Sequence, residues 1–174
     1  EGGWGSHPQL DGDIRWGNRG AVDHFGYEYS RADKTRLMAD ICRATGVEPP
    51  TLLVCTRKDR LGNCLRCAKC LRTMGGLLVE GEDPSRYGLT DRATAIDLIE
   101  KGIPGSGLSN NELFAWGTLQ RRARERLEGE HRPNDPFLTW LATVDLKHVS
   151  TKARVRRWVA YVTRPVRSLA RRSK

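Results

Sequence analysis

The chain has few of the residues and patterns that mark a familiar enzyme or membrane protein. Its 174 residues include four histidines, and no two of them have the spacing of a zinc-protease helix. No Ser/His/Asp set, Walker loop or dinucleotide-binding fingerprint is recognisable. No apolar run approaches the roughly twenty residues of a membrane-spanning helix. Aromatic residues make up 7% of the chain, which is sparse for a surface that stacks nucleic-acid bases. The residues therefore identify no catalytic group, and we expect a cytoplasmic protein.

Acidic residues are missing from residue 146 onward, although ten of the 30 Lys and Arg lie there. The preceding part carries the other 20 basic residues and all 21 acidic residues, so the net charge of +9 resides in the tail. Within residues 152–174, Val155, Trp158 and Val159 have helical spacing and alternate with arginines. Such a basic amphipathic helix could bind nucleic acid, lie on an anionic membrane, or dock on the protein's own body.

Five cysteines are present, and four of them follow the spacing C-x8-C-x2-C-x2-C within sixteen residues. These are Cys55, Cys64, Cys67 and Cys70. Zinc binds four thiolates in a tetrahedron, and an x2 spacing lets one tight turn present two sulfurs to the same ion. Because four protein ligands leave no open position, such a zinc site is structural. Disulfides, free core cysteines and an iron–sulfur cluster remain alternatives. Cys42 lies apart, and we expect it to be a small buried residue.

The pattern of turn and capping residues predicts an α/β unit followed by helices. A helix is expected over 31–45, with Ser30 and Asp33 close to a capping box and Gly46 after its end. Short strands are expected over 21–25 and 51–55 on either side of that helix. A further helix over 71–79 contains Gly75 and Gly76, which allow a neighbouring backbone to approach closely or mark a kink. Three more helices are predicted over 91–101, 110–127 and 136–144.

These elements suggest three segments. Residues 1–82 form the α/β part with the cysteines, and residues 88–147 form a small helical subdomain. Residues 148–174 form the basic amphipathic tail. The stretch between the first two segments, 80–88, has the composition of a turn and linker.

Several of these features together resemble a known family. The run from Tyr29 to Lys34, the isolated Cys55, and the run from Asn63 to Arg72 resemble the C-terminal part of 7-cyano-7-deazaguanine synthase, of the PP-loop ATP pyrophosphatase superfamily. Gly5-Ser6-His7-Pro8 and His24 match uncharacterised relatives of that enzyme. The resemblance covers about residues 3 to 80. It implies the C-terminal portion of a Rossmann-like PP-loop fold with a four-cysteine zinc site.

The resemblance also implies a chemistry. Proteins of this type adenylate a carboxylate with ATP and transfer ammonia to it. By the resemblance, Ser6, His7 and Arg31 would lie in the cleft that binds ATP and a small-molecule substrate. The loop Ser-Gly-Gly-x-Asp-Ser, which cradles pyrophosphate in this superfamily, does not occur in the chain. We therefore expect ATP and substrate to bind only with an upstream nucleotide-binding half, and the chain alone to be inactive.

A second function is also compatible with the sequence. A zinc-folded module with a cationic C-terminal tail could bind RNA or DNA without performing chemistry. The tail favours this alternative, whereas the nearly neutral remainder of the chain does not. The sequence is also compatible with an oligomer, and it specifies neither the substrate nor the catalytic residues.

Overall fold

The structure is a computed structural model that describes residues 8–17, 20–23, 25–55, 61–106, 108–129, 133–149, 151–152, 155 and 159. Contacts between residues divide the chain into two compact units, residues 1–34 and residues 35–174. Each unit is considered by itself. This division falls at Lys34, and the three segments expected from the sequence stay a prediction.

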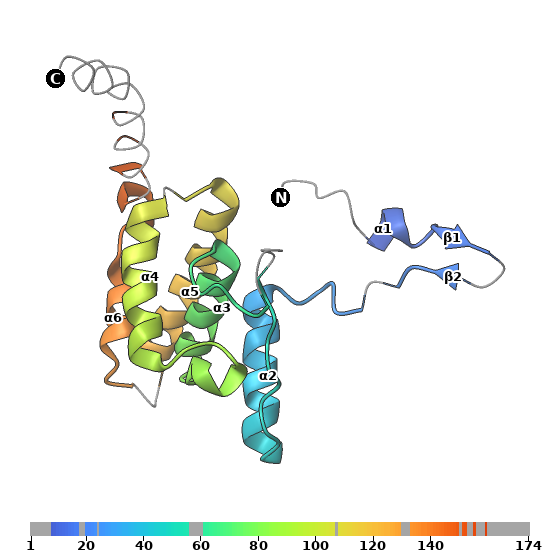
Figure 1. Cartoon of the computed structure of the whole chain (residues 1–174), viewed down its shortest axis with the longest axis horizontal. Coiled ribbons are helices and arrows are strands. Elements are labelled where there is room, and N and C mark those ends of the chain that lie inside the picture. Colours follow the sequence, from blue (N-terminus) through green and yellow to red (C-terminus); the bar gives the residue numbers. More distant parts are fainter. Residues whose placement is uncertain are drawn as a thin grey trace. The chain divides into compact units, whose positions relative to one another are not determined.

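The first unit contains a short helix and a two-stranded hairpin (Figure 1). Helix α1 spans Pro8–Asp11. Strand β1 (Arg15–Trp16) pairs antiparallel with β2 (Gly20–Ala21), with Arg15 opposite Ala21. Gly17 follows β1 with a φ of +59°, a backbone conformation that glycine adopts without strain. The strand expected over 21–25 is therefore only the end of this hairpin.

Helix α2 (Arg31–Thr45) has the bounds that the sequence predicts. The Ser30 N–H donates to Asp33 Oδ2 at 3.0 Å, and the Asp33 N–H donates back to Ser30 Oγ at 3.2 Å. This reciprocal pair is a capping box that satisfies two donors at the helix start. Gly46 follows the helix with a φ of +69° and donates to the Cys42 carbonyl. Both predicted end signals of α2 are thus confirmed.

Four α-helices and one short 3-10 helix form most of the second unit. They are α3 (Ala68–Val79), η1 (Pro84–Tyr87), α4 (Arg92–Ser106), α5 (Asn110–Glu128) and α6 (Pro136–Thr143). The predicted capping box of Ser109 and Glu112 begins α5, and Asp135 caps α6 by accepting from the Phe137 N–H. The predicted end of α4 near Lys101 is wrong, because the helix continues through Pro104 to Ser106.

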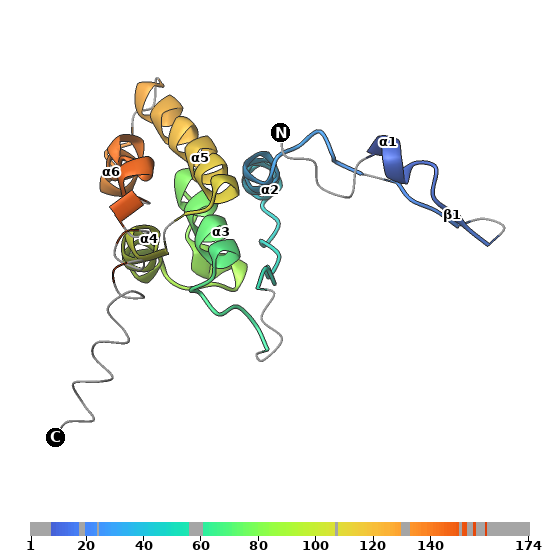
Figure 2. The same cartoon turned by 90° about the horizontal axis from the view of Figure 1, so that it is seen from above.

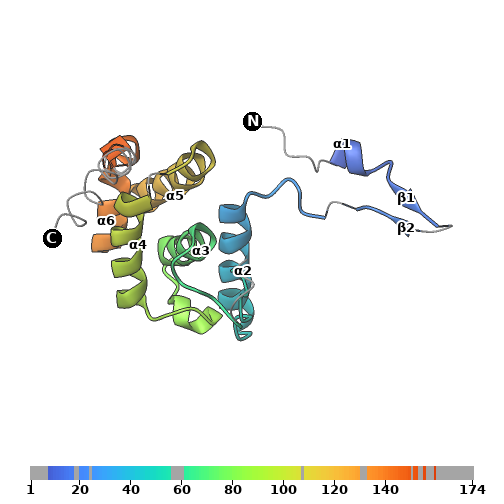
Figure 3. The same cartoon turned by 45° about the horizontal axis from the view of Figure 1, so that its top comes forward.

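Helix α3 lies at the centre of this unit, packed against both α4 and α5, and α6 packs on α5 (Figures 2 and 3). Gly75 allows the close approach to α5, since a Cβ there would lie 2.8 Å from Cζ3 of Trp116. Gly102 of α4 makes room for the Leu71 side chain in the same way. The glycine pair of α3 is therefore a packing surface. The largest fully buried side chains include Trp116, Tyr87, Phe137, Met74, Leu77, Leu78, Ile99 and Leu138.

Ion pairs hold the C-terminal end of α3 against α2 and α5. Glu80 and Glu82 are each only 5% exposed. Arg122 of α5 donates from Nε to Glu80 Oε1 at 2.9 Å, and Arg43 of α2 donates to Glu82 Oε1 at 2.9 Å. Buried carboxylates are tolerated when cations pair with them. Because Pro84 and Tyr87 are also buried, the stretch expected to be a linker is part of the packed unit.

The predicted Rossmann-like α/β fold is wrong, because the described part of the chain is mostly helical. Its only strands are the two-residue β1 and β2, and segment 51–55 runs uncoiled without a strand partner (Figure 1). The β-branched and apolar residues of 51–55 suggested a sheet strand. Its backbone groups instead bond to the Asn63 side chain and to the end of η1, which gives this segment an alternative to a sheet.

Candidate metal centre

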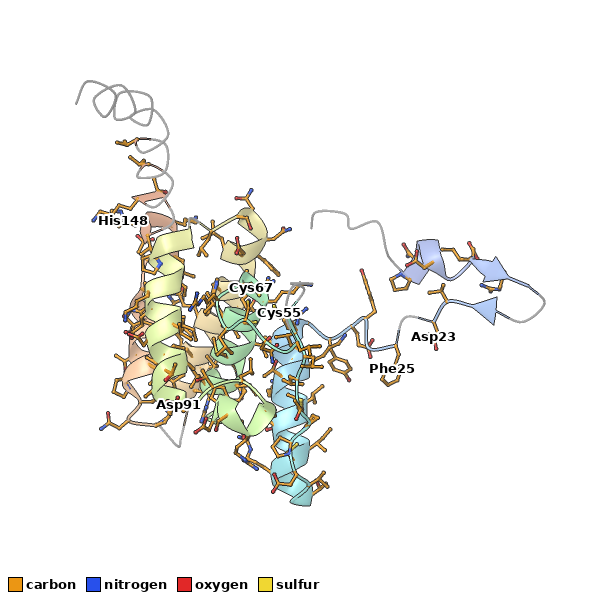
Figure 4. All side chains as sticks on the ribbon, in the orientation of Figure 1. Asp23, Phe25, Cys55, Cys67, Asp91 and His148 are labelled. Carbon is orange, nitrogen blue, oxygen red and sulfur yellow. The ribbon has the colours of Figure 1, made fainter. Side chains whose placement is uncertain are left out.

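The four clustered cysteines come from three consecutive pieces of the second unit. Cys55 ends the uncoiled segment, Cys64 and Cys67 lie in the turn before α3, and Cys70 lies in the first turn of α3. Their four Sγ atoms all lie within 4.8 Å of one another. The Sγ atom of Cys70 is 3.5 Å from that of Cys67 and 3.9 Å from that of Cys64. Figure 4 shows Cys55 and Cys67 side by side at the start of α3. The set could hold a metal ion.

The turn between Leu61 and Cys67 explains why two sulfurs meet here. Gly62 has a φ of +96° and Leu65 a φ of +59°, so the backbone of this turn adopts a positive φ twice within four residues. The Cys67 N–H then donates to Cys64 Sγ at 3.4 Å. Cys67 is the N-cap of α3, and its side chain makes no capping hydrogen bond, which leaves its sulfur directed to the cluster. The helix start thus places Cys67 and Cys70 on one side, three residues apart.

Asn63 holds the Cys55 piece against this turn. Its Oδ1 accepts from the Val54 N–H at 3.0 Å and from the Cys55 N–H at 3.3 Å. Its Nδ2 donates to the Leu52 carbonyl at 2.6 Å and to the Gly88 carbonyl at 3.3 Å. The Asn63 side chain therefore links the Cys55 piece both to the turn before Cys64 and to Gly88. The sequence places Asn63 only at the start of the run from Asn63 to Arg72, and its position directly before Cys64 is the one signal for this larger role.

The sulfur–sulfur distances of Cys70 to Cys64 and to Cys67 fit a single tetrahedral ion. Metal–sulfur bonds of about 2.3 Å at tetrahedral angles place neighbouring sulfurs about 3.8 Å apart. The distances of 3.5 and 3.9 Å lie close to this value. Both are far longer than the roughly 2.05 Å of a disulfide bond, and all four cysteines are free thiols. The donor set thus favours a soft metal with four thiolate ligands.

The thiols differ in their readiness to ionise. Burial alone would raise the pKa of Cys64, but the N–H groups of Arg66 and Cys67 and neighbouring thiols lower it to about 6. Burial, and next the hydrogen bond with the Cys67 thiol, together raise the pKa of Cys70 to about 12. Without a cation, one ionised sulfur therefore discourages ionisation of another. A bound metal ion would supply the positive charge that lets the whole set ionise.

The described part of the chain does not test the other predicted site residues. Ser6 and His7 lie outside the described residues, as does His24. Arg31 is the first residue of α2, exposed, and belongs to the first unit. Cys42 is half-buried on α2 and is not a member of the four-cysteine set. The cleft role expected for Ser6, His7 and Arg31 stays a prediction.

Comparisons with protein-family models, with curated proteins and with solved structures found no match to this chain. The resemblance to 7-cyano-7-deazaguanine synthase, the use of ATP and the nucleic-acid alternative therefore stay predictions. Of residues 152–174, which are expected to contact nucleic acid or membrane, the structure describes residues 152, 155 and 159. Among the described residues, no helix is both long enough and apolar enough to cross a bilayer.

Proposed function

We propose that Cys55, Cys64, Cys67 and Cys70 bind one zinc ion, and that this ion folds the cysteine segment onto the helical unit. The observation that carries the proposal is the meeting of all four Sγ atoms within 4.8 Å. Three separate pieces of chain provide these atoms, so their convergence is a property of the fold as well as of the spacing. Zinc is the common ion for such a tetrathiolate set.

A structural role follows from the number of ligands. Catalytic zinc sites keep one coordination position open for water or substrate, whereas four protein thiolates close the tetrahedron. The ion would link the end of segment 51–55, the turn and the first turn of α3. Leu53 and Leu61 are exposed, so this part of the chain buries little apolar surface. Thiolate–metal bonds would stabilise it instead. The proposed function is thus a zinc-stabilised helical protein whose metal is part of the fold.

The surrounding charges support a metal–thiolate centre. Four thiolates and one Zn²⁺ carry a net charge of about −2. The interleaved sequence contains Arg66, Lys69 and Arg72, and Arg72 bonds the Ala68 carbonyl at 3.1 Å within the first turn of α3. Cations near the cluster offset its negative charge. The Cys67 N–H donated to Cys64 Sγ stabilises a thiolate in the same way.

The test is the metal content of the purified protein. Elemental analysis should find one zinc per chain, and Cys64→Ser and Cys67→Ser should each lose it. Because structural zinc contributes on the order of 10 kcal/mol in small peptides, the hydrogen-bonded N–H groups of Val54, Cys55 and Cys67 should then lose their protection from exchange. Cys42→Ser is the matched control, since this cysteine lies outside the set and its loss should leave one zinc per chain. Stoichiometric iron, or a metal-free chain that keeps these three N–H groups protected, would contradict the proposal.

A further inference from the structure

Two of the four clustered cysteines, Cys67 and Cys70, lie three residues apart at the start of α3. Cys67 is the N-cap, and Cys70 lies in the first helical turn. Their Sγ atoms are 3.5 Å apart, which is closer than the 3.9 Å that separates Cys64 Sγ from Cys70 Sγ. Side-chain rotation can bring two such sulfurs to the roughly 2.05 Å of a disulfide bond. A Cys-x-x-Cys pair at a helix start is also an arrangement that proteins use for disulfide exchange.

The clustered thiols differ in their access to solvent. Cys70 is 0% exposed and Cys64 is 8% exposed, whereas Cys67 is half-buried. A reagent in solution can therefore reach the Cys67 sulfur first, and the Cys70 sulfur lies within 3.5 Å of it. Cys55 is half-buried as well, but it belongs to a separate piece of chain that the Asn63 side chain holds in place. A link between Cys67 and Cys70 needs no movement of that piece.

We propose that Cys67 and Cys70 form a reversible disulfide when the chain meets a low-molecular-weight disulfide, and that this reaction releases the zinc ion. The choice of the two sulfurs rests on their distance and their exposure. The release of the ion rests in addition on the proposed zinc centre. The cluster then acts as a redox switch as well as a structural element.

The reaction consists of two thiol–disulfide exchanges. The Cys67 thiolate attacks one sulfur of the small disulfide, whose S–S bond breaks, and one small thiolate leaves. The Cys70 thiolate then attacks the Cys67 sulfur of this mixed disulfide, and the second small thiolate leaves. The two cysteines together lose two electrons, which reduce the small disulfide to two thiols. The two protons of these thiols come from the cysteines, or from solvent where the cysteines are bound to metal.

The new bond changes the cysteine region and leaves the helices in place. Only Cys55 and Cys64 would remain as thiolate ligands, and two ligands do not hold a structural zinc ion. The disulfide links two residues of one helix start, so it does not fasten the Cys55 piece to α3. The buried contacts of α3 with α4 and α5 involve neither sulfur. Oxidation should therefore loosen segment 51–55 while the helical part stays folded.

Trypsin allows the pairing to be read directly, because Arg57, Arg66 and Lys69 separate the four cysteines and Arg72 follows the last one. The full chain as purified, with its zinc content measured, is treated with oxidised glutathione. The remaining thiols are blocked in denaturant, and the digest is analysed by mass spectrometry. Peptide 67–69 should be linked to peptide 70–72, or appear uncut as 67–72 with two hydrogens missing. One zinc ion should enter solution per link, and dithiothreitol should reverse both changes.

Substitutions separate the two exchange steps. Cys70→Ser removes the second attacking sulfur, so glutathione should accumulate on Cys67. A purely structural role would leave Cys67 no more reactive in this variant than Cys55 or Cys64. Cys67→Ser should abolish the link. Cys42→Ser is the matched control, because this cysteine lies outside the cluster and its loss should leave the link and the zinc release unchanged.

The outcomes distinguish this proposal from the zinc centre itself. A first link that includes Cys55 or Cys64, or no link at all in a zinc-loaded chain, would overturn the redox pair and leave the zinc centre standing. A chain purified without zinc that still links Cys67 to Cys70 would support the pair and overturn the release of metal. Stable glutathione on Cys67 in the unsubstituted chain would show that Cys70 does not complete the exchange, and the pair would then be wrong.

Discussion

Helix α3 joins two regions that are stabilised in different ways. The cysteine region, residues 51–70, buries Cys64 and Cys70 but leaves Leu53 and Leu61 exposed in its described part. The helical region, residues 71–146, buries large apolar side chains along α3, α4, α5 and α6. The helical region is therefore ordered by removal of apolar surface from water. The cysteine region is ordered by one asparagine side chain and, in our proposal, by four bonds to a metal ion.

Because of this difference, we expect each region to lose its structure without unfolding the other. Loss of apolar contacts should lower the stability of the whole helical unit, since those contacts are shared between its helices. Loss of the metal or of Asn63 should act locally, before α3. The predictions below test this comparison, beginning with the largest expected effect.

Trp116→Ala should have the largest effect, in the helical region. The ring is 2% exposed and lies directly over Gly75 of α3, so its removal leaves a cavity between α3 and α5. Truncating a buried aromatic residue costs about 3–5 kcal/mol of unfolding free energy. Urea denaturation would measure this loss, while zinc content below the transition should stay at one per chain. Phe114→Ala on the same helix is the control, because this exposed residue should change stability by no more than about 0.5 kcal/mol.

Zinc affinity should depend steeply on pH. Cys70 has its pKa raised to about 12 in the metal-free protein, so zinc must displace its proton at any lower pH. Affinity should therefore rise with pH by about tenfold per pH unit from this thiol alone, which is about 1.4 kcal/mol. The pKa of Cys64 is lowered to about 6, so below that pH a second displaced proton should steepen the slope. Competition with a chelator at several pH values would measure this, and a pH-independent affinity would contradict it.

Asn63→Ala should loosen the cysteine region while the helical region stays folded. The change leaves the Leu52 carbonyl and the Val54 N–H without their partner. Each unsatisfied buried group costs about 1–3 kcal/mol, and the partial exposure of this site places the total near the lower end. Hydrogen exchange should accelerate over 51–55 and zinc affinity should fall, with α5 unchanged. Asn63→Asp keeps the acceptor for Val54 but loses both donated bonds, so its effect should be intermediate.

Tyr87→Phe should have the smallest effect and the opposite sign. The Tyr87 hydroxyl is buried and has no hydrogen-bond partner in the described part of the chain. Removing it should stabilise the protein by about 1 kcal/mol. Burial, and next the charge of Glu82, raise the pKa of Tyr87 from 10 to about 12.

The same group predicts an alkaline effect. Because the folded-state pKa is raised, the unfolded state loses the Tyr87 proton at a lower pH than the folded state does, and the protein should lose stability as pH rises from 10 to about 12. Tyr87→Phe should therefore reduce the loss of stability between these pH values. Thermal denaturation at pH 8 and at pH 11 would measure the difference. An equal loss in both proteins would show that another group is responsible.

Local signals carried most of the correct predictions. Ser30 and Asp33 begin α2, Gly46 follows its end, and Ser109 with Glu112 begins α5, as their spacing indicates. These motifs work because each pairs backbone groups within a few residues of itself. The end of α4 was mispredicted because Gly102 and Pro104 are poor helix residues. Packing of Gly102 on Leu71 supports the helix through them.

The sequence by itself determined the capped helix ends, those of α2 and the starts of α5 and α6, and the four thiols that can share one metal ion, because both depend on residues close together along the chain. Only the tertiary structure decided the fate of segment 51–55. Its composition is that of a strand, yet its backbone groups bond the Asn63 side chain and the Tyr87 carbonyl. Tyr87 lies more than thirty residues from this segment in the sequence. A hydrogen bond across such a separation depends on the whole packed unit, and no local pattern specifies it.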